Sequence, residues 1–136
     1  MTVFYLTDSD IYMAFGISGD PDLPKMVDSD VTIVYYDSRE KRAKVVDYYI
    51  TAKSQCAPQS NSGACPDVKI PAARDDTQMV SYNFADGILR VAYKRPLVTG
   101  DPADQDFFID SPVTTVAAIG PLNSRREAAV SNKMIS

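Results

Sequence analysis

The chain alternates short runs of β-branched and aromatic residues with turn-forming residues, and this alternation favours strands over helices. The runs are Ile11–Phe15, Val31–Tyr36, Lys44–Thr51, Met79–Phe84, Ile88–Tyr93, Phe107–Ile109 and Val113–Ile119. The segments between them carry no convincing amphipathic helical repeat, although residues 124–127 could cap one short helix. Many short strands with frequent turns are typical of an all-β sandwich or barrel.

Two pairs of neighbouring runs are predicted to form hairpins. Asp86 and Gly87 separate one pair, and Asp-Gly suits the positive φ angles of a two-residue hairpin turn. A polar turn joins the second and third runs in the same way. In the third run, Val46, Tyr48 and Ile50 form the uniformly apolar face, because successive side chains of a strand alternate. We therefore expect these three side chains to point into the core.

The length of 136 residues is that of one domain, so we predict a single domain over residues 1–136. No apolar run approaches the roughly 18 residues that a membrane-spanning helix needs. The first eight residues lack the basic start and long apolar core of a secretory signal. If the protein is exported, we expect this chain to be a fragment of a larger extracellular protein.

The charge balance is acidic, with 18 Asp and Glu against 14 Lys and Arg. It argues against nucleic-acid binding, which rewards clustered Lys and Arg. Histidine is absent from the sequence, which removes the commonest general acid or base near neutral pH. The sequence also has no Gly-x-Ser-x-Gly elbow for a nucleophilic serine. We therefore predict that the chain is not an enzyme.

Cys56 and Cys65 are the two cysteines, and the loop between them is polar and contains Gly and Pro. A disulfide closing so short a loop would add on the order of 2–3 kcal/mol of stability in the chain-entropy model. Two free buried thiols are the alternative. A zinc site would need two more ligands, and the chain has neither a histidine nor another cysteine to supply them. We predict a disulfide and an oxidising, extracellular compartment.

Three groups of motifs then follow in order along the chain. They are Ile11–Gly19 with Lys25–Val31, Val46–Ile50 with the cysteine loop, and Tyr93–Asp104 with Ala118–Asn123. From about residue 11 to 130 this order resembles the DOMON domain, most closely the form in the Skeletor/Knickkopf type of cuticle protein. The resemblance implies an immunoglobulin-like antiparallel β-sandwich with a ligand cleft between or beside its sheets. It also implies a scaffold or ligand-binding role in organising chitinous cuticle or matrix.

The resemblance raises two expectations about departures from the family. The first family strands look missing or shortened before Tyr5. The other departure concerns haem. DOMON domains of the cytochrome type hold haem b between a methionine and a later histidine, and Met26 falls on the methionine position. The histidine is expected near residues 131–132, where this chain has Ser and Asn.

Met26 is nevertheless the residue we would expect to ligate a haem, with Lys133 or Met134 opposite it. A tyrosine or Met13 could also serve as the second ligand. A haem bound in this way would make the domain an electron-transfer partner of an oxidoreductase. The alternative is that Met26 fills the core, as methionine does well.

Arg95 is the second candidate for cofactor binding. Pro96 ends the strand before it, and Arg95 could pair with Asp104 to fix the following turn. It could instead belong to a rim of polar groups that bind a sugar or a haem propionate, with Arg95 as the partner of the anion. Asp101, Asp104 and Asp106 offer oxygen ligands for calcium, but their spacing is not that of the usual loop, and such acids are commonly solvated.

The tyrosines of the central strands are the last candidates, because aromatic rings stack on sugars and the phenol adds a hydrogen bond. They are Tyr35, Tyr36, Tyr48, Tyr49, Tyr82 and Tyr93. Packing within and between strands is the alternative role. The sequence thus leaves three functions open: a non-catalytic matrix module, a haem-carrying electron-transfer domain, and a carbohydrate-binding module that contacts chitin.

Overall fold

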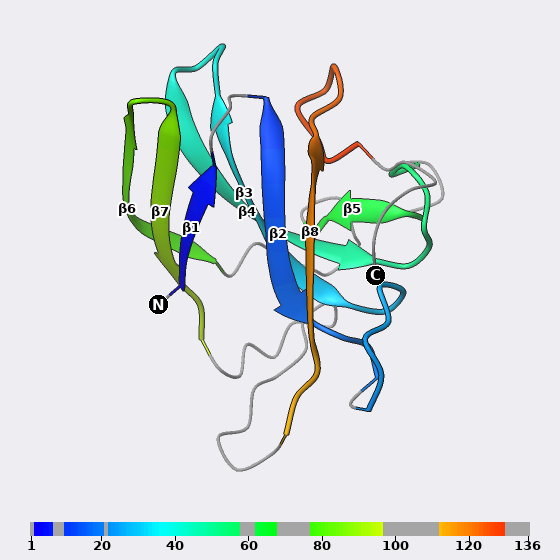
Figure 1. The fold of residues 1–136 in the computed structure, drawn as a ribbon. Helices are drawn as coiled ribbons and strands as arrows, with labels where there is room; N and C mark the ends of the chain where they lie inside the picture. Colours follow the sequence, from blue (N-terminus) through cyan, green and yellow to red (C-terminus); the bar gives the residue numbers. More distant parts are fainter. Residues whose placement is uncertain are drawn as a thin grey trace.

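The computed structural model describes residues 2–6, 10–20, 22–57, 62–67, 77–96 and 112–129, and its regular structure there is β-strand throughout. Two antiparallel sheets face each other as a sandwich (Figure 1). The smaller sheet has the order β1 (Thr2–Leu6), β7 (Ile88–Lys94), β6 (Gln78–Ala85). The larger has the order β5 (Ala64–Pro66), β4 (Arg42–Ile50), β3 (Asp30–Asp37), β2 (Ile11–Ile17), β8 (Thr115–Pro121). The predicted all-β sandwich is confirmed.

The predicted hairpins are also confirmed. Asp86 and Gly87 join β6 to β7 with φ angles of 55° and 74°, as a two-residue turn requires. β3 and β4 pair from Asp30 opposite Tyr49 to Asp37 opposite Arg42. Two strands were missed, the short β5 and β1, which pairs along β7. The run predicted at 107–109 lies outside the described residues.

The larger sheet is apolar on both faces. Ile33 and Val34 are neighbours on β3 and therefore point in opposite directions, yet both are buried. Val34 packs with the smaller sheet in what we call the inner core: Val34, Ala43, Leu89, Val91 and Tyr93. Ile33 packs on the far side of the larger sheet in what we call the outer core: Tyr12, Ala14, Met26, Val31, Ile33, Tyr35, Tyr48, Ile50, Ala64, Val116 and Ala128.

The face of β4 predicted to be buried lies in the outer core. Tyr48 and Ile50 belong to it, and Val46 packs against it. Their burial is as expected, but they point away from the smaller sheet. Val45, on the opposite face of the same strand, packs against the inner core. The apolar pattern therefore identified a buried face without identifying which layer covers it.

Two loops cover the outer core in place of a third sheet. The Gln55 side chain donates to the Ala128 carbonyl at 2.8 Å, and Arg125 donates to the Cys56 carbonyl at 3.3 Å. The N–H of Ala128 donates to the buried hydroxyl of Tyr48 at 3.3 Å. These bonds hold the cysteine loop and the segment after β8 over the larger sheet.

The short helix considered for residues 124–127 is wrong. Asn123 closes a tight loop instead, because its side-chain oxygen accepts the N–H groups of Arg125 and Glu127 at 2.9 and 3.0 Å. Arg126 has a φ of 61°, which a right-handed helix does not accommodate. Leu122 and Ala128 then pair across the base of the loop.

If both faces of the larger sheet are cores, a truncation in either core should destabilise the protein. Ile33→Ala in the outer core and Leu89→Ala in the inner core should each lower the free energy of unfolding by about 2–5 kcal/mol. Ile119→Ala is the control: this side chain lies on the edge strand β8 and is 61% exposed, so the change should be within about 0.5 kcal/mol. Urea denaturation measures all three. A cost at Ile33 no larger than that at Ile119 would show that the outer face is not a core.

Candidate functional site

The polar end of the space between the sheets is centred on Arg95, which directly follows β7. Its guanidinium reaches across to the other sheet and pairs with Asp30 at the start of β3, with 2.9 Å between Nη1 and Oδ2. The Arg95 side chain is 10% exposed and the Asp30 side chain is 0% exposed. Because a buried charge is costly without a partner, this pair fixes the ends of the two sheets relative to each other.

The observed partner of Arg95 bears on its predicted roles. β7 ends at Lys94, before Pro96, as predicted. The proposed partner Asp104 lies outside the described residues, as do the calcium candidates Asp101 and Asp106. Arg95 also lines an open depression of about 340 Å³ with Gln78, Lys94 and Pro96. A role in binding an anion stays a prediction.

A second buried acid lies beside this pair. Asp47 of β4 is fully buried, and it stands opposite Thr32 in the register of the larger sheet. Its carboxylate accepts a hydrogen bond from the hydroxyl of Thr77, just before β6, and a longer one of 3.5 Å from Thr32. Asp47 therefore ties β4 to the entry of β6. Neither Asp30 nor Asp47 stood out in the sequence, where both read as strand or turn residues.

Met26 lies in the loop between β2 and β3, where its side chain is 3% exposed and belongs to the outer core. Its carbonyl accepts hydrogen bonds from the N–H and the hydroxyl of Ser29, which fixes the loop. Met26 also lines an open depression of about 300 Å³ with Pro24, Lys25, Val27 and Lys53. That volume is at the lower limit of ordinary ligand sites.

These residues fit a haem poorly. The Met26 side chain is packed among apolar neighbours on the outer face of the larger sheet, not at the space between the sheets. The chain has no histidine to ligate the iron opposite it. Lys133 and Met134, the expected second ligands, lie outside the described residues. The observed surroundings favour the core role of Met26, and its role as a haem ligand stays a prediction.

The predicted disulfide joins Cys56 to Cys65, with an S–S distance of 2.08 Å and 4.8 Å between the Cα atoms. Both cysteines are buried. Gly63 has a φ of 106°, and a Cβ there would lie 2.5 Å from the Gln55 carbonyl oxygen, so only glycine fits. The N–H of Gly63 donates to the Thr51 hydroxyl at 2.8 Å. The cysteine loop is thus closed both covalently and by hydrogen bonds at its base.

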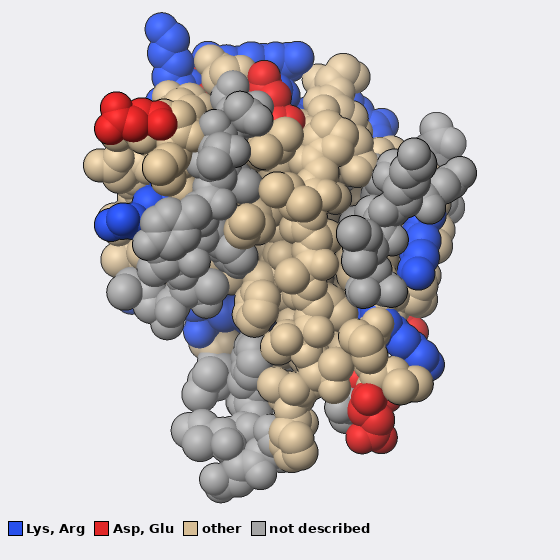
Figure 2. Space-filling model, viewed as in Figure 1, with Lys and Arg blue, Asp and Glu red and all other residues tan. Residues whose placement is uncertain are grey.

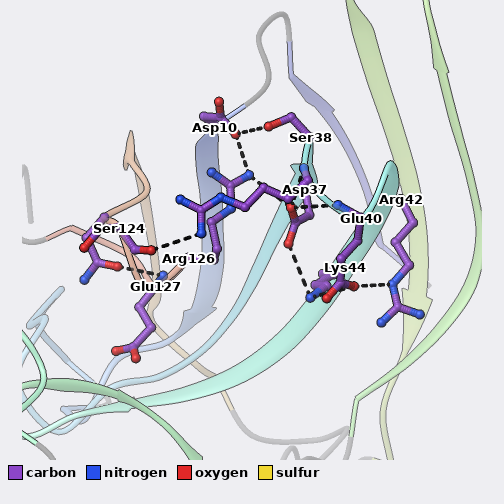
Figure 3. Close-up of polar contacts among 11 residues, drawn as sticks. Asp10, Asp37, Ser38, Glu40, Arg42, Lys44, Ser124, Arg126 and Glu127 are labelled. Carbon is purple, nitrogen blue, oxygen red and sulfur yellow. Dashed lines mark hydrogen bonds and ion pairs between the residues drawn. The ribbon is translucent and has the colours of Figure 1, made fainter.

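An ion-pair network occupies the end of the larger sheet where the β3–β4 turn lies (Figure 3). Arg126, in the loop after β8, binds Asp10 and lies 3.3 Å from the buried carboxylate of Asp37. Lys44 on β4 lies 3.4 Å from Asp37 and 3.0 Å from Glu40. The network joins the start of β2, the β3–β4 turn and the loop that covers the outer core. No sequence motif pointed to it, because its members are far apart in the chain.

Asp37 is the electrostatic centre of this network. Burial alone would raise the pKa of its carboxyl group. The backbone N–H groups of Glu40 and Arg39, together with Lys44 and Arg126, outweigh burial and hold the pKa below the ordinary value of 3.8. Asp37 is therefore ionised at neutral pH and serves as a structural anchor.

The tyrosines considered for sugar stacking differ in how far they are buried. Tyr35, Tyr48 and Tyr93 are buried, and burial raises the pKa of the Tyr48 phenol. Tyr49 and Tyr36 are half-buried. Tyr82 on β6 is 42% exposed. Packing is therefore the role of the buried three, whereas the exposed ring of Tyr82 remains available to a ligand.

Metal ligation finds no support in the ranges that the structure describes, since no three His, Cys, Asp or Glu side chains gather there as ligands. Nor do those ranges contain a helix long and apolar enough to cross a membrane.

Comparison with known proteins gives a family and two relatives. The family model of the DOMON domain matches residues 1–120. "Protein Skeletor, isoforms B/C" and "Protein Skeletor, isoforms D/E", both of Drosophila melanogaster, are each 31% identical over 118 residues. These residues are 87% of this chain, but only 15% and 8% of the two relatives. No solved structure matches the chain significantly.

The ion-pair network predicts a pH dependence. Because the pKa of Asp37 is lowered on folding, its contribution is complete above pH 3.8 and is lost as the pH falls through the folded-state pKa. Asp37→Asn should cost roughly 1–3 kcal/mol at pH 7, and this cost should shrink toward pH 3. Asp22→Asn, at an exposed loop acid, is the control. Urea denaturation at both pH values is the measurement, and a cost at Asp37 that does not change with pH would contradict the assignment.

Proposed function

The chain belongs to the DOMON family, and on that premise we propose that it is a non-catalytic extracellular module of a longer, Skeletor-like protein. Its role is to contact the polysaccharide of a chitinous cuticle or matrix. The resemblance to the cuticle type of DOMON protein implies this role, and the disulfide and the buried acids of the chain support it.

An extracellular location is supported by the disulfide. Cys56 and Cys65 form a buried bridge that closes the loop over the outer core. Disulfides form and persist in oxidising compartments and are rare in the cytosol. A small secreted module also gains from such a bridge, because its cores alone supply limited stability.

The observation that carries the proposal is the role of three buried acids, Asp30, Asp37 and Asp47, which supports a non-catalytic module. Asp30 pairs with Arg95, Asp47 accepts hydrogen bonds from threonines, and Asp37 is held by two cations. Each of these acids joins two separate elements of the sandwich. Their charges are committed to a rigid framework that presents a binding surface.

The alternative function is electron transfer through a haem b held by Met26, with a partner oxidoreductase. No feature of the described residues favours it over the core role of Met26. A visible absorption spectrum during titration with hemin separates the two functions.

The proposed function predicts retention of the recombinant, disulfide-bonded protein on insoluble chitin. Retention should persist at high salt, because contact with a neutral polymer does not depend on screened charges. Insoluble cellulose, which lacks acetamido groups, is the matched control for the polymer. The amount of protein left in the supernatant at low and high salt is the measurement. Equal recovery from chitin and from a mock incubation would reject the proposal.

A further inference from the structure

The edge strand β6 is unusual in its exposure. Every residue from Gln78 to Ala85 is exposed except the half-buried Met79, whereas all but one residue of the central strand β3 is buried. β6 lies at the outer margin of the smaller sheet, and in the part of the chain that the structure describes it pairs with β7 alone (Figure 1). One whole side of this strand therefore faces outward.

Two aromatic rings stand on this strand. Tyr82 and Phe84 are two residues apart and so point to the same side. They lie opposite Val91 and Leu89 of the inner core. Phe84 stacks on Tyr36 of the larger sheet, with 4.2 Å between ring centroids and 24° between the planes. Tyr82 is 42% and Phe84 36% exposed, so the two rings form a surface at the open margin of the inner core.

Because these rings are already packed, they lose little side-chain conformational entropy when a ligand binds. A stacked Phe84 is already oriented, and aromatic side chains have few rotatable bonds to immobilise. We call Tyr36, Tyr82 and Phe84 the aromatic edge.

The charge of β6 indicates what the aromatic edge binds. Charged residues make up 24% of the chain, yet none lies within Gln78–Ala85. The exposed polar side chains of the strand, Gln78, Ser81 and Asn83, are also neutral, but they point to the opposite side from Tyr82 and Phe84. An uncharged strip also occurs elsewhere on the molecule. On the face shown in Figure 2, charged side chains lie mainly toward the margins, and the strip over β8 has no charged side chain. β6 differs from the β8 strip in that it also carries exposed rings, one of which is stacked on the other sheet.

A backbone irregularity argues against a protein strand as the ligand. The register between β6 and β7 shifts between Met79 and Ser81, which places a β-bulge in the edge strand. Bulges twist an edge and interrupt the regular ladder that a further strand would need. A ligand that stacks on side chains is less affected by such a break than one that pairs with the backbone.

We propose that the aromatic edge is the surface that binds polysaccharide, and that it takes a neutral, N-acetylated chain. The apolar faces of the sugar rings lie on Tyr82 and Phe84, on the side of β6 that faces the larger sheet. This inference rests on the proposed function and adds the site and the chemistry of the ligand to it.

The test uses a soluble hexamer of N-acetylglucosamine titrated by calorimetry, together with retention on chitin. Tyr82→Ala should weaken both by roughly fivefold or more, as expected for the loss of one stacking ring. Tyr82→Phe keeps the ring and should bind within about twofold of the unmodified protein. Ile119→Ala, at an exposed apolar residue of the other sheet, should have no effect. Thermal denaturation checks that each variant is folded.

The outcomes separate this inference from the proposed function. If the unmodified protein binds chitin and Tyr82→Ala binds equally well, the site is wrong while the function stands. If the unmodified protein binds neither probe, both are wrong. A Tyr82→Ala variant that loses self-association but not sugar binding would show that the aromatic edge is a protein interface, which also overturns the inference.

Discussion

The five-stranded sheet has two apolar faces, but the three-stranded sheet can cover only one of them. Burial of apolar surface is the main favourable term in folding, so the second face requires a cover of its own. Here the cover is the cysteine loop and the segment after β8, which meet through Gln55 and Ala128 and lie over Tyr48. The disulfide restricts the first of these segments, and the Arg126 pairs restrict the second. The disulfide and the Arg126 ion pairs both restrain irregular backbone. Without them, these segments would gain conformational entropy by leaving the surface of the larger sheet.

Buried charge performs the corresponding task between the sheets. Arg95 and Asp30 connect the end of β7 to the start of β3, and Thr77 connects to Asp47 on β4. Such pairs add little net stability compared with apolar packing, but breaking one leaves a buried charge without its partner. They therefore penalise any other alignment of the sheets. A sandwich fixed in this way presents its surface residues in constant positions, as a binding module requires.

The sequence predicted most of the described strands and the disulfide, because both depend on short-range chemistry, but it missed β1 and β5. The alternation in β4 identified Tyr48 and Ile50 as buried, and the Asp86-Gly87 pair identified a hairpin. The layer that Tyr48 faces could not be predicted, because alternation distinguishes two faces without stating what covers each. The exposure of Tyr82 depends on the position of β6 at a sheet edge, and so on long-range strand order. The same limit applies to Arg95, whose partner Asp30 is far from it in sequence. The sequence showed an arginine before a proline but not the acid that it meets.

The disulfide-closed cysteine loop covers the outer core of the larger sheet. The most direct test of this cover is hydrogen exchange of the folded protein, measured with the disulfide intact and with it reduced. If the loop covers this core, reduction should lower the protection of amides in β4 and β5 around Tyr48 and Cys65, while amides of β7 around Leu89 keep theirs. Equal loss of protection in both regions, or none in either, would contradict a separate outer core held by the Cys56–Cys65 bridge.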